Sequence, residues 1–189
     1  PPRGKQEQEI EFMGLPSSIV VLSMTREMDY NIRHNICLEA LKSILQTRCM
    51  NVIREKEGGT YAVNVNQGVV YEPVAQYSMI VEFQCDPLNA AKLKGIVYGE
   101  LERLRQQVPS RDELMMALNS IRKKEGEARE SNVYWQEKLV LYYRTGLNQA
   151  DVREFEEIVD KLTPEDFLEF VREFWENVDI TDVVFKPKS

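Results

Sequence analysis

The sequence predicts an α+β fold, with one antiparallel or mixed sheet of four to five strands and helices packed on one face of it. Segments with the two-residue period of strands lie in the first half of the chain, around one long amphipathic segment. A run of helical segments follows, and a last β-rich segment closes the chain. Strands and helices that are segregated in this way are typical of α+β domains rather than of doubly wound sheets. A length of 189 residues with 43% apolar residues suits a single domain.

The N-terminal part begins with a polar, charged segment, and two predicted strands follow. Residues 1–9 are polar, and we expect a linker or frayed terminus there, followed by a single domain over residues 10–189. Residues 10–14 predict a short strand, and the run SIVVLSM at residues 18–24 predicts a longer one. Because the chain opens on Pro-Pro-Arg-Gly without an initiator methionine, we expect a domain cut from a longer protein.

A long helix is predicted after these strands. Asp29 offers an N-cap, and the helix is expected to run to about Lys56. Gly58 and Gly59 then provide a stop, because glycine tolerates the left-handed cap conformation. Apolar residues recur at helical spacing along it: Cys37, Leu41, Ile44, Leu45 and Val52.

A hairpin is predicted next from two segments that alternate between apolar and polar residues. In the first segment Tyr61, Val63 and Val65 share one face. The second segment alternates in the same way and places four side chains on its apolar face: Tyr77, Met79, Val81 and Phe83. Glu72-Pro73 supplies the turn, so the two strands are expected to be antiparallel with one buried face.

The second half predicts five helices and a final strand. Asp86-Pro87 is expected to open a helix that ends near Gln107, and the capping box Ser110–Glu113 another that ends near Glu130. The remaining predicted elements are helices at residues 132–146 and 149–161, a helix capped by Thr163-Pro164-Glu165-Asp166, and a strand from Ile180 to Lys186. The mixed charges of residues 122–130 indicate a solvated helix face.

Composition excludes several classes of function. A net charge of −7 disfavours nucleic acid as a partner, and no apolar run approaches the ~20 residues that span a bilayer. Cys37, Cys49 and Cys85 lack CxxC spacing, so they are expected to be small buried side chains. His34 is the single histidine, which rules out HExxH and HxxEH zinc motifs within these residues and favours a surface or partly packed side chain. The chain is therefore expected to hold no metal site and no complete active site.

The segment IREKEGGTYAVNV, residues 53–65, carries a family resemblance. It places Arg54 at a helix end, Gly58 and Gly59 in the following turn, and Tyr61 at the start of a strand, seven residues after the arginine. This arrangement resembles the C-terminal half of the insulinase/pitrilysin metallopeptidases, the M16 family with the inverted zinc motif. The preceding helix and the order of elements from about residue 10 are also similar to domains of that family.

The resemblance implies a substrate-binding domain of a zinc metallopeptidase built from paired domains that close like a clamshell around a peptide. The zinc site would lie on an N-terminal domain of the same chain or on a partner subunit. Tyr61 would donate a hydrogen bond to the scissile carbonyl oxygen, and Arg54 would hold a backbone carbonyl of the substrate. Gly58 and Gly59 would let the turn bring both side chains close to the peptide.

Other interpretations of these residues remain open. Arg54 in a last helical turn interacts favourably with the helix dipole without any function. Tyr61 shares a strand face with Val63 and Val65, so it is also compatible with core packing. A non-catalytic scaffold or partner subunit of the same fold is the main alternative function, and an unrelated α+β interaction domain is a third.

Overall fold

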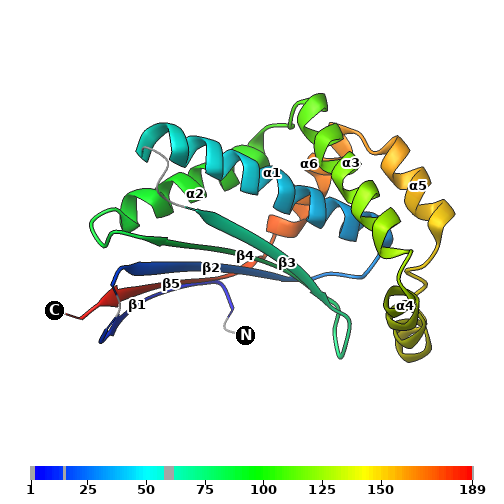
Figure 1. The fold of residues 1–189 in the computed structure, drawn as a ribbon, viewed down its shortest axis with the longest axis horizontal. Coiled ribbons are helices and arrows are strands. Elements are labelled where there is room, and N and C mark those ends of the chain that lie inside the picture. The colour runs from blue at the N-terminus through cyan, green and yellow to red at the C-terminus, as the bar shows by residue number, and fades with distance from the viewer. Residues whose placement is uncertain (1–2, 15, 58–61, 189) are drawn as a thin grey trace.

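The computed structural model describes residues 3–14, 16–57 and 62–188, which form two layers (Figure 1). One layer is a five-stranded mixed sheet, made of β1 (Lys5–Phe12), β2 (Ser18–Glu27), β3 (Val63–Val70), β4 (Gln76–Cys85) and β5 (Asp179–Pro187). The helices are α1 (Ile32–Glu57), α2 (Ala90–Gln106), α3 (Arg111–Ala128), α4 (Asn132–Thr145), α5 (Val152–Lys161) and α6 (Pro164–Trp175). The predicted α+β class is confirmed.

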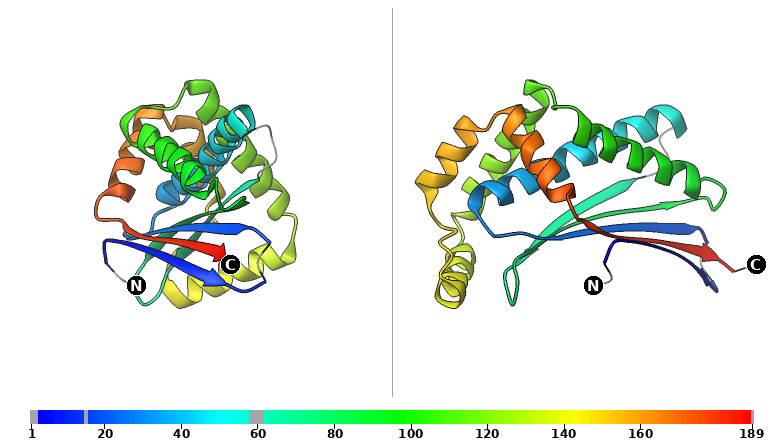
Figure 2. Two further views of the ribbon diagram at one scale, coloured as in Figure 1. Left: turned by 90° about the vertical axis from the view of Figure 1, so that its left-hand side faces the viewer. Right: turned by 180° about the vertical axis from the view of Figure 1, so that it is seen from behind.

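The helical layer covers one face of the sheet. Both views in Figure 2 show α1, α2, α3, α5 and α6 on the same side of the strands. Helix α4 lies apart from this layer, at the end of the molecule where the β3–β4 hairpin turns. An ion pair between Arg144 of α4 and Glu72 of that turn joins the two.

The sheet has the strand order β1-β5-β2-β4-β3. The last strand, β5, enters between the first two; it pairs parallel with β1 and antiparallel with β2. The hairpin strands β3 and β4 are antiparallel, as predicted, and β4 joins them to β2. The returning strand predicted at Ile180–Lys186 is therefore an interior strand of the sheet, second in the strand order.

Residues 5–9 correct the prediction of an N-terminal linker. They form the first part of β1 and pair with residues 180–184 of β5. Every side chain of β1 is exposed, so this edge strand is stabilised mainly by its backbone pairing with β5. Composition alone could not distinguish such a polar edge strand from a frayed end.

The core lies between α1 and the inner face of the sheet. The predicted apolar face of the hairpin is confirmed for Val63, Val65 and the four β4 residues, which are all buried. The predicted helix positions Cys37, Leu41, Ile44 and Leu45 are buried as well. Val52 is only half-buried, because the turn of α1 places its neighbour Ile53 against the core instead.

Three helices begin later than predicted, and one of them is α5, which starts at Val152 after the N-cap Asp151 and not at residue 149. Met28 still donates its backbone N–H to the Ala75 carbonyl at 3.1 Å, and α1 begins only at Ile32, three residues after Asp29. Asn31 caps α1 instead, since its side-chain oxygen accepts from the His34 N–H at 2.7 Å. Before α2, the Asp86 carboxylate accepts from the Leu88 N–H at 2.8 Å, which makes a turn rather than a cap.

The starts of α3 and α6 agree with the predicted caps. The Ser110 hydroxyl accepts from the Glu113 N–H at 3.2 Å at the start of α3. Thr163 and Asp166 form a complete capping box at the start of α6. At α3 the box is only half formed, because the Glu113 carboxylate binds Arg48 of α1 rather than the Ser110 backbone.

Candidate functional site

The residues predicted to bind substrate lie at the connection between α1 and β3. Arg54 belongs to the last turns of α1, and its side chain lies outside what the structure describes. Gly58, Gly59 and Tyr61 lie outside the described residues altogether. The structure therefore describes the frame of the predicted site, namely the end of α1 and the start of β3. These two ends lie at the same end of the molecule as the β4–α2 turn (Figure 1).

Gln46 fixes this frame by binding the backbone of β3. Its side-chain Nε2 donates to the Val63 carbonyl, and its Oε1 accepts from the Val65 N–H at 2.7 Å. The Val63 N–H points at the Met50 sulfur at 3.4 Å. Strand β3 is an edge strand, so side chains of α1 satisfy backbone groups that no neighbouring strand reaches. The start of β3 is thereby held against the last three turns of α1.

Buried apolar side chains reinforce the same frame. Ile53, one residue before Arg54, and Val63 are both buried in the core. They anchor the chain on either side of the connection that carries Gly58, Gly59 and Tyr61. Sequence reasoning did not single out Gln46, because no spacing rule distinguishes a glutamine that reaches an edge strand from one that faces solvent.

An ion pair between Arg48 and Glu113 joins α1 to α3. Arg48 donates from Nε and Nη2 to the two carboxylate oxygens of Glu113, at 2.7 Å each. This bidentate geometry gives a strong, directional contact and raises the pKa of Arg48. Helix α1 is thus held from both sides, by Arg48 towards α3 and by Gln46 towards the sheet.

The three cysteines are buried, as predicted, and their thiols are unreactive. All three thiols are free. Burial raises the pKa of Cys37 and of Cys49 to about 12, and it also raises the pKa of Cys85. Neutral, enclosed thiols are poor nucleophiles and poor metal ligands.

The side chain of the single histidine packs against aromatic rings. The His34 ring lies 5.5 Å from the ring of Phe170 and 6.1 Å from that of Tyr77, between centroids. Its Nε2 is 3.6 Å from a carboxylate oxygen of Glu173. With a side chain that is 20% exposed, His34 agrees with the predicted partly packed state.

The donor set does not fit a zinc site. Among the residues that the structure describes, no group of three or more His, Cys, Asp or Glu side chains is arranged to hold a metal ion. Tetrahedral zinc requires three or four nitrogen, sulfur or carboxylate ligands around one point, and here the only histidine is engaged in aromatic packing. In the same described ranges, none of the helices has the length and apolarity needed to cross a membrane.

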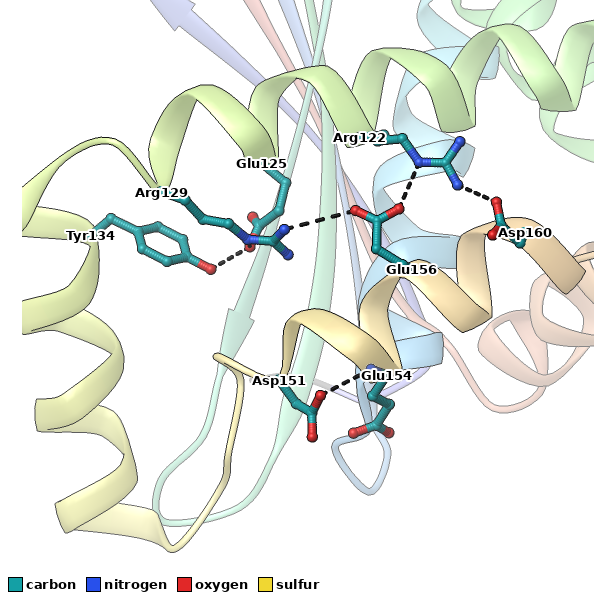
Figure 3. Close-up of polar contacts among 8 residues, drawn as sticks. All are labelled: Arg122, Glu125, Arg129, Tyr134, Asp151, Glu154, Glu156 and Asp160. Atoms are coloured by element: carbon teal, nitrogen blue, oxygen red, sulfur yellow. Dashed lines mark hydrogen bonds and ion pairs between the residues drawn. The ribbon is translucent and has the colours of Figure 1, made fainter.

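A polar network joins α3, α4 and α5 (Figure 3). Arg122 of α3 binds Glu156 at 2.8 Å and also Asp160, both on α5. Residues 122–130 were expected to be a solvated face, and this expectation is wrong for Arg122. The acidic face of α5 packs over it, a contact between segments more than 30 residues apart that no local charge pattern reveals.

Arg129 extends the network towards α4. It lies 3.3 Å from Glu125 and 3.7 Å from Glu156, and its guanidinium carbon is 5.0 Å from the centre of the Phe155 ring. Tyr134 of α4 donates its hydroxyl hydrogen to Glu125. These contacts attach the second half of the helical layer to the first by charge and hydrogen bonds.

Comparison with known proteins identifies the family. A family model described as the peptidase M16 inactive domain matches residues 1–121. The chain belongs to the M16 peptidase family. An Arabidopsis thaliana protein named zinc protease PQQL-like is 22% identical over 121 residues, which are 61% of this chain and 13% of that protein.

Solved structures of M16 peptidases share the fold. The periplasmic protease PqqL from Escherichia coli has a TM-score of 0.82 and 18% identity over 99% of this chain and 21% of that chain. The ferredoxin protease FusC, in complex with Arabidopsis ferredoxin, has a TM-score of 0.78 and 14% identity, covering all of this chain and 21% of its own. An M16 inactive domain from Pseudomonas fluorescens has a TM-score of 0.74 and 19% identity, with 45% of its chain covered. At such identities the structures show the fold alone.

This M16 chain spans only part of its relatives. It covers 13% of the curated relative and about a fifth of the PqqL chain. The activity, substrates and partners of a whole M16 peptidase are thus properties of longer chains than the one described here.

Proposed function

We propose that this M16 chain is a substrate-binding domain from the C-terminal half of a zinc metallopeptidase, which cleaves peptides inside a clamshell chamber. Zinc belongs to another domain, on the same polypeptide or on a partner subunit. The observation that carries the proposal is the sequence Arg54, Gly58, Gly59 and Tyr61 at the junction of α1 and β3 in a chain of this family. The chain alone, without the zinc-bearing domain, is expected to be inactive.

Tyr61 and Arg54 have different roles in the proposal. The phenolic O–H of Tyr61 donates to the oxygen of the scissile carbonyl as that oxygen gains negative charge, which is oxyanion stabilisation. Arg54 donates to a backbone carbonyl elsewhere on the peptide and holds it in register. The zinc ion of the other domain supplies Lewis acidity and an activated water.

The contacts that hold the junction of α1 and β3 support these two roles. Gln46 and Ile53 fix the end of α1 against β3. The short connection between this helix and this strand therefore starts and ends at defined points. A side chain that stabilises developing charge is effective only when its position is set before the reaction.

Substitution of Tyr61 by phenylalanine in the complete enzyme tests the proposal. The change removes one hydroxyl and keeps the ring, so we expect kcat for peptide cleavage to fall by roughly 10²–10³, the usual effect of one lost oxyanion donor. Arg54→Ala is expected to raise KM more than it lowers kcat, because a backbone clamp binds substrate and transition state alike. Cleavage of a quenched fluorescent peptide measures both parameters.

The control is the thermal midpoint of each variant. Equal midpoints with reduced cleavage support the proposed roles. Unchanged cleavage by Tyr61→Phe, together with a lowered midpoint for Tyr61→Ala, would identify Tyr61 as a packing residue and would contradict the proposal.

A non-catalytic scaffold of the same fold is the second candidate. It is favoured by the description of the matching family model as an inactive domain. A scaffold has no need of the Tyr61 hydroxyl or the Arg54 guanidinium. The same two substitutions therefore distinguish the candidates, since a scaffold predicts full cleavage activity in both variants.

A further inference from the structure

A cleft of about 490 Å³ lies at the end of the sheet where β2 stops and β5 begins. Three segments that are far apart in the sequence line it: the residues before β1, the end of β2, and the turn between α6 and β5. Its lining residues are Arg3, Gly4, Arg26, Glu27, Asn177, Val178 and Asp179. This volume lies in the range of ligand sites and is much larger than one water molecule needs.

Backbone contacts hold the walls of the cleft together. The Ile180 N–H donates to the Gly4 carbonyl at 3.0 Å, and the Gly4 N–H donates to the Asp179 carboxylate at 2.6 Å. Asp179 is in turn level with Thr25 of β2 in the sheet. Gly4 has a φ of +78°, a conformation that favours glycine, so the chain turns immediately before β1. The cleft is therefore positioned by the pairing of the sheet.

Arg26 is a charged residue at the end of a row of buried apolar positions. Val20, Leu22 and Met24 precede it on β2 at a spacing of two, and all three are buried in the core. The alternation of side chains along a strand puts Arg26 on this same face, towards the helical layer. Its Nε is shielded from solvent and has no hydrogen-bond partner. Shielded donors in proteins are normally hydrogen-bonded, so Arg26 is matched to an acceptor that the described residues do not supply.

The acidic side chains of the cleft do not neutralise its two arginines. In the part of the chain that the structure describes, neither Arg3 nor Arg26 forms an ion pair. Asp179 accepts the Gly4 N–H instead. Glu27 is exposed and follows Arg26 in β2, so its side chain leaves the opposite face of the sheet. Within these described segments, two guanidinium groups thus line the cleft without a carboxylate partner.

We infer that this cleft binds a carboxylate group of a peptide. A guanidinium presents a planar fork of N–H donors that matches the two oxygens of a carboxylate. The side-chain amide of Asn177, in the same lining, adds further N–H donors. The choice of a peptide rests on the proposed function, whereas the choice of a carboxylate follows from the arginines. A peptide carries this group at its C-terminus and on its Asp and Glu side chains.

The cleft is separate from the connection of α1 and β3. Val63, the first residue of β3, is level with Val20 of β2 through their common partner Phe83. Arg26 lies six residues beyond Val20 on the same strand, which is about 20 Å further along the sheet. A carboxylate held by Arg26 is therefore remote from the scissile bond that we place at Tyr61. The cleft acts on the binding of the peptide and not on the reaction.

Fluorescence anisotropy with a labelled peptide tests the inference in the complete polypeptide that carries this chain. A chelator of zinc is present, so that the peptide is not cleaved during the measurement. Three versions of the peptide are compared: one with a free C-terminal carboxylate and acidic side chains, one with a C-terminal amide, and one with Asn and Gln in place of Asp and Glu. The protein variants are Arg26→Gln and Arg3→Gln. Arg153→Gln is the matched control, because it removes the same charge from an α5 side chain that is 90% exposed.

We expect Arg26→Gln to weaken the binding of the unmodified peptide by roughly ten- to a hundredfold, the usual effect of lost charge-assisted hydrogen bonds. One modified peptide should bind the parent protein equally weakly and thereby identify the source of the carboxylate, either the C-terminus or an acidic side chain. Arg26→Lys keeps the charge without the fork and should recover only part of the affinity. Arg3→Gln should also weaken binding, and because Arg3 is exposed its loss does not disturb the core.

Equal binding of all three peptides to the parent protein would overturn the inference. An equal loss of affinity in Arg26→Gln and Arg153→Gln would also overturn it, because net charge alone would then explain the effect. A lowered thermal midpoint of Arg26→Gln, together with unchanged binding by Arg3→Gln, would identify Arg26 as a structural residue and would have the same consequence. Since the readout is binding without cleavage, its failure would leave the roles proposed for Tyr61 and Arg54 untouched.

Discussion

Gln46 sets the geometry of the candidate site through two hydrogen bonds to the backbone of β3. Gln46→Ala removes a donor and an acceptor, and it leaves the Val63 carbonyl and the Val65 N–H without their helix partner. A partly buried backbone group that loses its partner costs about 1–3 kcal/mol. We expect the urea midpoint to fall accordingly, and hydrogen exchange at Val65 to accelerate.

Gln46→Glu is the matched control for that variant. The carboxylate can still accept from the Val65 N–H, but it repels the Val63 carbonyl because it has no hydrogen to donate. Exchange at Val65 should therefore stay slower in Gln46→Glu than in Gln46→Ala. Identical exchange in both variants and the parent chain would show that the contact does not hold the edge strand.

Asp182 is a buried charge in the centre of the sheet, with 1% of its side chain exposed. Its carboxylate lies 2.9 Å from the Lys94 ammonium and accepts from the Tyr98 hydroxyl at 3.2 Å, so it joins β5 to α2. Asp182→Leu leaves Lys94 without its partner, which costs about 3–5 kcal/mol for buried pairs. The double variant Asp182→Leu/Lys94→Met should recover most of that loss.

Urea unfolding of the two single variants and the double variant measures the coupling. Additive losses would contradict this account, because additivity would mean that the two groups act independently.

At the scale of elements, the capping box of α6 predicts a pH dependence. The Thr163 backbone N–H and hydroxyl donate to the Asp166 carboxylate at 3.0 and 2.8 Å, and Arg33 binds it at 2.6 Å. These contacts hold the pKa of Asp166 below its ordinary value near 3.8. Because the pKa is lower in the folded state, the stabilisation is complete above the unfolded pKa and is lost as the pH falls through the folded one.

Asp166→Asn tests this pH dependence. At pH 7 the variant should be less stable by roughly 0.5–1 kcal/mol, an amount suited to a partly exposed cap. The difference should shrink as the pH is lowered from about 5 towards 2. Glu165→Gln, in the same helical turn but outside the box, is the matched control and should show a smaller difference. If the stability difference between Asp166→Asn and the parent chain were the same at every pH, the geometry of the cap and not its charge would stabilise the start of α6.

The end of an element is predicted correctly when the contacts that set it are close together in the sequence. The caps at Ser110 and Thr163 use atoms within three residues, so their sequence is sufficient to predict them. The cap of α1 is also local, from Asn31 to the His34 N–H, but which polar residue serves as that cap depends on the pairing of Met28 with Ala75, far along the chain. Local reasoning therefore placed that helix start too early, at Asp29.

For the whole molecule, the residue inventory predicts that the chain binds no zinc stoichiometrically. One histidine and three cysteines at separated positions cannot surround a tetrahedral ion, and the thiols are stabilised in the neutral form by burial. Metal analysis of the purified chain after dialysis against zinc measures this. One zinc per chain would contradict the prediction and would require ligands that the described structure does not bring together.

The sequence by itself determined the α+β class, the hairpin with its buried face, the late helix caps and the segment from Arg54 to Tyr61 that resembles M16 peptidases. Each of these depends on periodicity or on residues close together in the chain. Only the tertiary structure decided that residues 5–9 pair with β5, that Gln46 holds the edge of β3, and that the apolar residues of α4 point outward. These features arise from contacts between segments distant in sequence, and periodicity indicates that a helix has an apolar side without indicating which side faces the core.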